Sequence, residues 1–342
     1  MNRTGIAAGG NWIVDRVKTV DCLPGRGMLA NIRREEVSTG GAPANVLADL
    51  ARMGAAFPLT AVGMVGADRD GEYILNAFRR HGIDVSHLAT TDRAATSYTD
   101  VMTDEGSGAR TFYHHRGANA LFAPEHVPVD RLTCRLFHLG YLLLLDEMDK
   151  PDAACGTRAA RLLAAVQKAG IKTSVDVVSE ESDRFRTVVP HALAYVNYLI
   201  LNEIETGRIT GRPVRLADGT LDAESLAAAV GDLCRLGKMD LVAVHMPEGF
   251  HVREKGGACH WGGSLVLPDG YIAGTVGAGD AFCAGMLHGL HEGWDCRRSA
   301  RLATCCAAAC LANANASDGL MPLKDVLELG QRFPEREPPV RA

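Results

Sequence analysis

The chain has 342 residues, of which 47% are hydrophobic and 23% charged, and its formal net charge is −5. This composition is typical of a globular protein of one large domain or two, and the mild negative charge lacks the basic footprint of a protein that binds nucleic acid or an acidic membrane surface. No apolar run approaches the roughly 20 residues that cross a bilayer, and the first residues lack the apolar core of a secretory signal.

Extended segments dominate the N-terminal region. Residues 6–10 are apolar and end in a glycine turn, which predicts a short buried strand, and residues 12–20 and 29–38 predict two more strands around the break at Pro24. Asp15 lies near the end of a strand, a position where open α/β sheets often contact a ligand. The alternative is a solvated aspartate in a turn.

The pair Gly40-Gly41 opens a helical pattern that runs over residues 46–53, with Pro43 at a position that helix starts tolerate. Asn45 is polar at the head of this apolar helix. It is either a cap or a hydrogen-bonding group for a polar ligand.

Further elements follow in order: a buried strand over residues 59–65, an amphipathic helix over 70–81, and a hairpin made of 96–103 and 110–115. His114 and His115 stand side by side in the second hairpin strand. Adjacent residues of a strand point to opposite faces, so we do not expect a metal site there.

A regular alternation begins at residue 136. Strands are predicted over 136–139, 173–177, 198–201 and 241–244, and helices over 153–169 and 223–236. Such alternation indicates a parallel sheet covered on both faces. The segments 12–38 and 96–115 do not fit it and predict a small separate sheet that serves as a lid. The Pro- and charge-rich tail from residue 331 to 342 is predicted to be disordered.

The glycine-rich stretch 274–280 is the strongest local signal for chemistry. It lies between a segment that we predict to be extended, 264–272, and an apolar helix over 282–290. Backbone N–H groups at a helix start lack intrahelical partners and favour an anion. With Asp280 beside them, they suit phosphoryl transfer to a hydroxyl that the carboxylate deprotonates. The alternative is an ordinary capped helix after a glycine turn.

Two other segments leave predicted strands at the ligand-binding edge. Asn202 and Glu205 could hold the hydration shell of Mg²⁺, or they could simply start a helix. The turn 244–249 is placed where a nucleotide could lie. The apolar helices 282–290 and 300–311 could line an adenine pocket, or they could belong only to the hydrophobic core. The P-loop, protein-kinase and dinucleotide-binding motifs are absent from the sequence.

Four motifs occur in one order and together resemble the ribokinase-like (PfkB) carbohydrate kinases: Gly-Gly-Ala-Pro-Ala-Asn at 40–45, Gly-Ala-Asn at 117–119, Asn-Glu-x-Glu at 202–205 and Gly-Thr-x-Gly-Ala-Gly-Asp at 274–280. The resemblance covers the chain to about residue 330. It implies an α/β fold with a three-layer Rossmann-like core, a mainly parallel central sheet and a small β-sheet lid, in one domain over residues 1–330.

The resemblance also implies roles for individual residues. Asp280 would be the catalytic base and Gly277, Ala278 and Gly279 the anion hole. The sugar would be bound by Asp15, Gly40, Gly41, Asn45 and Asn119. The nucleotide and its Mg²⁺ would be bound by Asn202, Glu205, His245, Gly249, Thr275, Gly277 and Gly279, with Glu205 holding the metal through water.

Two positions depart from the family pattern. Gly274 stands where the family usually has an aspartate that helps bind a monovalent cation, which puts activation by K⁺ in question, and the loop 313–317 is also unusual. Pro247 stands where the nucleotide turn usually has a glycine. ATP remains the expected phosphate donor.

We therefore expect an ATP-dependent kinase of a small fructose- or ribose-like sugar, with sugar and ATP as its partners and a homodimer formed through the lid. The ten cysteines are scattered without a C-x-x-C pair, which predicts buried thiols and a cytoplasmic location. One alternative is a nucleoside kinase, for which Tyr98, Phe112 and Tyr113 could supply an aromatic platform or merely pack the hairpin. The other alternative is a non-catalytic sugar-binding regulator on the kinase fold.

Overall fold

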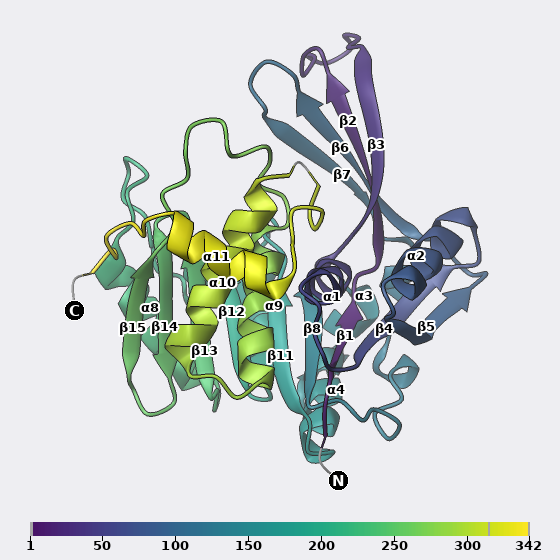
Figure 1. Ribbon diagram of the computed structural model, residues 1–342. Helices are drawn as coiled ribbons and strands as arrows, with labels where there is room; N and C mark the ends of the chain where they lie inside the picture. Colours follow the sequence, from purple (N-terminus) through teal and green to yellow (C-terminus); the bar gives the residue numbers. More distant parts are fainter. Residues whose placement is uncertain (1–2, 314, 341–342) are drawn as a thin grey trace.

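The computed structural model describes residues 3–313 and 315–340. A large α/β body carries a small sheet that projects from one side of it (Figure 1). The central sheet of the body has nine strands in the order β15-β14-β13-β12-β11-β8-β1-β4-β5, of which β14 and β15 are antiparallel to their neighbours and the others are parallel. Its strands are β1 (Ile6–Gly10), β4 (Leu59–Gly66), β5 (Asp84–Thr91), β8 (Leu136–Leu142), β11 (Lys172–Val177), β12 (Tyr198–Asn202), β13 (Leu241–Met246), β14 (Gly249–Glu254) and β15 (Cys259–Gly263).

Two hydrophobic cores cover the two faces of this sheet. Successive side chains of a strand point to opposite faces, and in β12 Ile200 joins one core whereas Leu199 and Leu201 join the other. The first core packs α1 (Ala42–Arg52), α2 (Arg69–Arg80), α9 (Ala278–His291), α10 (Cys296–Leu311) and α11 (Leu323–Arg332). The second core packs α3 (Asp146–Asp149), α4 (Arg158–Lys168), α5 (Arg184–Thr187), α6 (Val189–Leu193), α7 (Glu203–Thr210) and α8 (Ala223–Leu236). The predicted three-layer α/β fold is confirmed.

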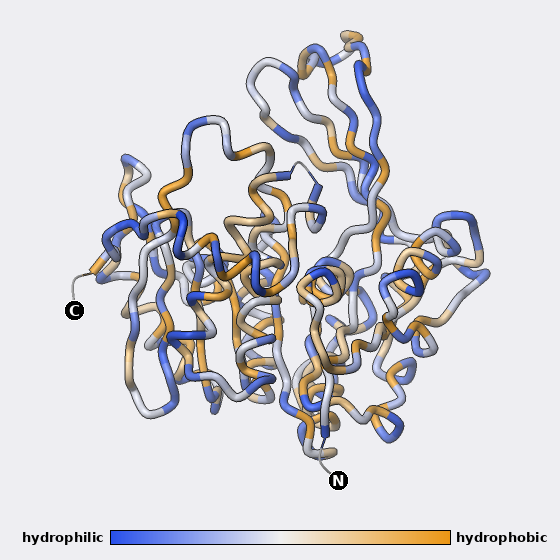
Figure 2. The backbone as a smooth tube through the Cα atoms, in the orientation of Figure 1, coloured by the Kyte–Doolittle hydropathy of each residue, from blue (hydrophilic) through white to orange (hydrophobic). Residues whose placement is uncertain are grey.

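The small sheet contains β2 (Ile13–Val20), β3 (Ile32–Gly40), β6 (Ser97–Asp104) and β7 (Arg110–His115) in the order β3-β2-β6-β7. Its register places Asp15, Thr99 and His114 side by side on adjacent strands. Figure 2 shows that β3 is largely hydrophilic, whereas hydrophobic segments gather in the central body. We call this sheet the lid.

Some local predictions were wrong. The helix predicted from residue 153 begins at Arg158, because Pro151–Asp152 and Gly156–Thr157 pair as a short hairpin and the Thr157 side chain caps the helix. The segment 264–272 is not a strand and forms only a bridge between Leu265 and Glu335. Strands β5, β14 and β15 were not predicted.

The C-terminal segment is more ordered than we predicted. Helix α11 continues to Arg332, and the backbone N–H of Val266 donates to the carbonyl of Pro334 at 2.8 Å. The N–H of Arg336 donates to the carbonyl of Ser264, also at 2.8 Å. Residues 334–336 therefore pair with the segment that precedes the glycine-rich stretch, and the predicted disorder is wrong for them. Within the described ranges, no helix is long and apolar enough to cross a membrane.

Candidate active site

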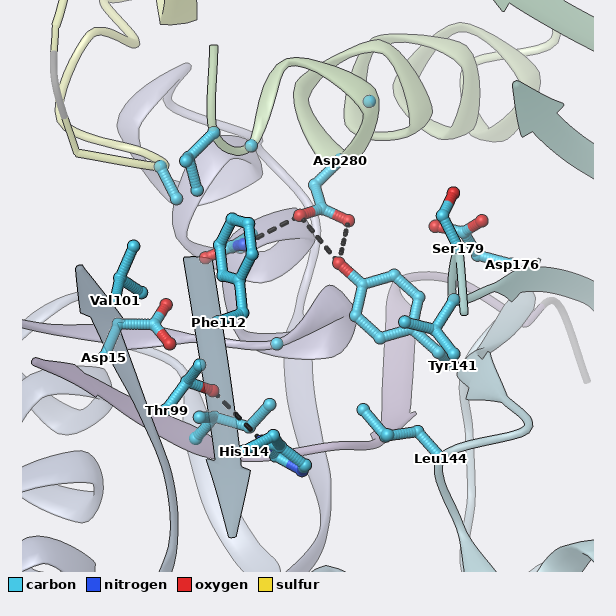
Figure 3. Close-up of a pocket in the computed structure, with 18 of the residues that line it drawn as sticks. Asp15, Thr99, Val101, Phe112, His114, Tyr141, Leu144, Asp176, Ser179 and Asp280 are labelled. Carbon is cyan, nitrogen blue, oxygen red and sulfur yellow. Dashed lines mark hydrogen bonds between the residues drawn. The ribbon is translucent and has the colours of Figure 1, made fainter. Parts of the chain in front are cut away.

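A cavity of about 680 Å³ lies between the lid and the carboxyl ends of the central strands. The lid contributes Asp15, Thr99 and His114, and the strand ends contribute Tyr141 and Asp176 (Figure 3). Asn202 and His245 also line the cavity from strand ends. Ligands of open parallel sheets bind at this edge because the strand ends and the helix starts meet there. Most of the residues that the sequence singled out converge on this cavity.

Asp280 lies in the first turn of α9 and is only 5% exposed. The Asn45 side-chain amide donates to its Oδ2 at 2.7 Å, and the Tyr141 hydroxyl lies 3.0 Å from Oδ1 and 3.1 Å from Oδ2. Burial raises the pKa of Asp280 to about 6, while the hydrogen bonds from Asn45 and Tyr141 hold it down. A carboxylate with this pKa is largely ionised at pH 7 and can accept a proton.

Asn45 does not cap its own helix. Helix α1 begins after Gly41 without a side-chain cap, and the Asn45 amide is used instead to reach Asp280, 235 positions later in the chain. Of the two roles that the sequence left open for Asn45, the cap is therefore wrong.

The glycines at the start of α9 are required by close contacts. Gly277 has φ +80°, and a Cβ added there would lie 2.1 Å from the carbonyl oxygen of Ala316. A Cβ on Gly279 would lie 3.1 Å from the His245 ring. No side chain caps this helix, and Gly277 and Gly279 line the cavity, so an anion bound there would satisfy the first N–H groups.

Asp15 faces the same space from β2. Burial raises the pKa of Asp15 to about 6; a hydrogen bond from Thr99 lowers it, and the nearby charge of Asp280 raises it. A Cβ on Gly40 would lie 1.9 Å from Asp15 Oδ2, so Gly40 makes room for this carboxylate. Gly41 has φ +94° and lines the cavity itself.

Asn202 and Glu205 form a reciprocal capping box at the start of α7. The Asn202 side chain accepts from the Glu205 N–H at 2.8 Å, and Glu205 Oε2 accepts from the Asn202 N–H at 3.0 Å. Both side chains also line the cavity. Asn202 and Glu205 therefore stabilise the start of α7, and their side-chain oxygens also lie at the ligand-binding edge of the sheet.

Asp176 was not assigned a role from the sequence. It stands in β11 close to the strand end and lines the cavity. Burial and then the charges of Glu205 and Asp280 raise the pKa of Asp176 well above its usual range, and burial raises the pKa of Glu205 to about 7. Buried carboxyls that repel one another in this way are typical of a site that takes a cation. The position of Asp176 near the end of a predicted parallel strand was the sequence signal that could have identified it as a site residue.

Several residues from the sequence prediction lie outside the cavity lining. Asn119 is fully buried, and its side chain binds the backbone N–H and carbonyl of Trp12 at 3.2 and 3.1 Å, so it shapes the chain before β2. Gly249 is the first residue of β14, where a Cβ would meet the Gly262 carbonyl at 2.0 Å. Thr275 is exposed, and Ala278 packs partly against the core.

His245 is a cavity residue, as predicted from its turn. Burial lowers the pKa of His245 to about 4, so its ring is neutral at pH 7.

The lid side chains divide between two faces. Phe112 and His114 line the cavity, whereas His115 stacks on Tyr98 with ring centroids 5.1 Å apart. Tyr98 and Tyr113 are absent from the lining, so Phe112 alone of the three aromatic residues considered for a nucleoside platform faces the site. The expected separation of His114 from His115 is confirmed.

Tyr141 was also missed by sequence reasoning. It lies in β8 among apolar residues, and nothing local in that run distinguishes a cavity tyrosine from a core one. Only the pairing of β8 beside β1 and the approach of α9 bring its hydroxyl to Asp280.

The chain is similar to known carbohydrate kinases in sequence and in fold. Residues 3–323 match the model of the pfkB family carbohydrate kinases. A ribokinase of Arabidopsis thaliana is 26% identical over 318 residues, covering 91% of this chain and 76% of the relative, and a fructokinase of Klebsiella pneumoniae is 27% identical over 280 residues, covering 79% and 81%. The structure of Arabidopsis thaliana ribokinase complexed with ribose and ATP superimposes with a TM-score of 0.75 at 22% identity, covering 96% of this chain and 99% of that one.

Proposed function

This chain belongs to the pfkB family of carbohydrate kinases, and from that premise we propose that it transfers the γ-phosphate of ATP to a primary hydroxyl of a small fructose- or ribose-like sugar. The observation that carries the proposal is the position of Asp280. Its carboxylate stands at the uncapped start of α9, inside a cavity that also contains Asp15 and Asn45.

Asp280 is the proposed general base. A pKa of about 6 places it close to neutral pH, where a base is ionised and still has affinity for a proton. The amide of Asn45 and the hydroxyl of Tyr141 fix the orientation of the carboxylate. Asp15 has oxygens for the remaining sugar hydroxyls, and Gly40 and Gly41 allow the backbone to approach them closely.

The phosphate end of the reaction is assigned to the start of α9. The N–H groups of residues 277–279 would stabilise charge on the transferring phosphoryl group, because fixed backbone donors act strongly in a site that excludes water. Gly277 and Gly279 leave no side chain in the way. The neutral His245 ring beside Gly279 adds no charge of its own there.

The residues present fit Mg²⁺. Hard cations prefer carboxylate oxygens and water, and Asp176 and Glu205 offer two buried carboxyls whose mutual repulsion a cation would relieve. When bound, Mg²⁺ supplies charge neutralisation across the phosphate oxygens. Asp176 and Glu205 hold the position for it, and Asn202 keeps Glu205 oriented by donating to its Oε1 at 2.8 Å.

The residues present do not fit the monovalent cation of the family. Gly274 offers no carboxylate, and the Cys310 thiol donates to the carbonyl oxygens of Val276 and Ala316 at 3.3 and 3.1 Å. With no carboxylate at position 274, the proposed reaction includes no step that uses K⁺.

Release of ADP with a panel of sugars and nucleosides tests the proposal. Turnover of a ketohexose or pentose, at a rate well above ATP hydrolysis without an acceptor, supports it. Preferential turnover of nucleosides would instead favour a nucleoside kinase, for which Phe112 in the cavity is the supporting observation. Sugar binding with no ADP from any acceptor would point to a regulator.

We also propose a homodimer formed through the lid and a cytoplasmic location. The lid has two outer strands, β3 and β7, and exposed apolar residues such as Val37 and Tyr113, which a second copy could cover. Free cysteines, several of them buried, and a requirement for ATP suit a reducing cytoplasm. Sedimentation analysis of the wild type and of a Tyr113→Glu variant tests the dimer; a monomeric wild type contradicts it.

A further inference from the structure

The inner face of the lid carries a row of side chains with a common orientation. Arg110, Phe112 and His114 alternate along β7 and all line the cavity. Alternate residues of a strand share a face, so Arg110 is presented to the same space as the residues that surround Asp15. The register places Thr103 of β6 directly opposite Arg110.

Arg110 lacks a partner among the described residues. Its Nη1 is buried and makes no hydrogen bond, and no carboxylate of the described chain forms an ion pair with it. Burial lowers the pKa of Arg110, and no neighbouring acid opposes this. The hydroxyl of Thr103 is also buried and unpaired.

Two positive groups on the opposite face of the lid, by contrast, have counter-charges. Arg16 pairs with Asp70 at 2.6 Å, and Lys18 pairs with Asp100. Arg110 is only partly buried, but its Nη1 is buried without an acceptor, and a buried polar group without a partner is costly. The exception at Arg110 faces the space where the acceptor binds.

We propose that the acceptor is an anionic sugar, one that carries a carboxylate or a phosphate, and that Arg110 with Thr103 binds this group. The inference rests on the proposed kinase function and narrows its substrate class. A guanidinium presents paired N–H donors that match both anions, and the hydroxyl adds a further donor.

Charge also fixes the orientation of such an acceptor. Asp15 and Asp280 lie at the reacting end of the cavity, and their ionised forms repel an anionic group of the acceptor there. Arg110 lies four residues from His114 along β7, a strand distance of about 13 Å. The anionic group therefore lies toward the outer part of the lid, and the hydroxyl at the other end of the sugar is left for Asp280.

Paired acceptors test the inference. ADP release is measured with fructose against fructose 6-phosphate, and with glucose against gluconate, for the wild type and the Arg110→Met and Arg110→Lys variants. We expect the wild type to have a kcat/KM at least about 30-fold higher for one anionic acceptor than for its neutral counterpart, the factor that corresponds to a desolvated charged contact. Arg110→Met should remove this preference, and it should change kcat/KM for the neutral acceptor by less than about threefold.

Arg34→Met is the matched control, because Arg34 is an exposed lid arginine on β3 that pairs with Glu36 and does not line the cavity. The Arg34→Met variant should keep the preference for the anionic acceptor. Arg110→Lys keeps the positive charge but lacks the planar guanidinium, so it should keep part of this preference. A thermal melt that shifts upward with the anionic sugar for the wild type but not for Arg110→Met adds a readout that does not depend on turnover.

Three results would overturn the inference. If the wild type prefers neutral sugars, the inference about an anionic acceptor is wrong and the kinase proposal still stands. Equal losses for anionic and neutral acceptors in Arg110→Met, with a raised KM for ATP, would assign Arg110 to the nucleotide. If no acceptor of either kind releases ADP, the kinase proposal itself fails, and the inference fails with it.

Discussion

The hydroxyl of Tyr141 lies 3.0 and 3.1 Å from the two carboxylate oxygens of Asp280, so one phenol bridges both atoms of the proposed base. Together with the amide of Asn45 at 2.7 Å, it surrounds a buried carboxylate with donors. Because hydrogen bonds to the ionised form oppose the effect of burial, they set the pH at which Asp280 can accept a proton.

Replacing Tyr141 by Phe should therefore raise the pKa of Asp280 above its value of about 6. The base is active when ionised, so the rate falls as the pH drops through this pKa, and the variant should lose activity at a higher pH than the wild type. A shift of the acidic limb by roughly half a unit to one unit is expected, measured as kcat against pH. Tyr73→Phe, whose hydroxyl binds the Val37 carbonyl outside the main cavity, serves as control. An unmoved limb would mean that the Tyr141 contact is absent during catalysis.

Asp280→Asn should lower kcat by about 10²- to 10⁴-fold, the usual contribution of a positioned base. Sugar affinity should change only a few-fold, because the amide has nearly the same shape and Asn45 remains in place. Single-turnover kinetics and equilibrium binding separate the two effects. Turnover close to that of the wild type would rule out Asp280 as the base.

Gly277→Ala should impair both folding and turnover. Its φ of +80° disfavours a side chain, and the new Cβ would meet the Ala316 carbonyl at 2.1 Å. Gly270→Ala is a matched control, since Gly270 has φ +77° with no atom within 4 Å of the added Cβ. The control should lose about 1 kcal/mol of stability and no activity. Equal activity losses in both variants would indicate a general effect of backbone strain.

Asp49→Asn should stabilise the protein more as the pH rises. Asp49 is fully buried in α1 and neither of its carboxylate oxygens has a hydrogen-bond partner, and burial and then the charge of Asp280 raise its pKa well above the usual range. Between the unfolded and folded pKa values the folded protein binds the extra proton, so the wild type loses stability as the pH rises through this window. The asparagine variant has no such loss.

Urea unfolding at pH 5 and pH 8 measures the difference, which we expect to be about 1–3 kcal/mol larger at pH 8. A difference that does not depend on pH would show that Asp49 is ionised with an unseen partner.

Local sequence signals were sufficient wherever the chemistry of a short segment dictates its conformation. The glycines before α9 and the capping box of Asn202 and Glu205 each depend on residues within a few positions, and both were correctly placed at the cavity. The motif of Asn119 says nothing of Trp12, more than 100 positions earlier, whose backbone N–H and carbonyl both bind the Asn119 amide.

The sequence by itself determined the alternation of strands and helices, the helix mouth that carries Asp280 and the family of the chain, because periodicity and glycine geometry act over short distances along the backbone. Only the tertiary structure decided that Asn45, Tyr141 and Asp280 meet, that Phe112 and Arg110 face the cavity while Tyr98 and Tyr113 do not, and that Arg110 has no counter-charge in the part of the chain described here. These relations depend on strand register and on the packing of distant segments, which bring together side chains whose separation in sequence carries no trace of their contact.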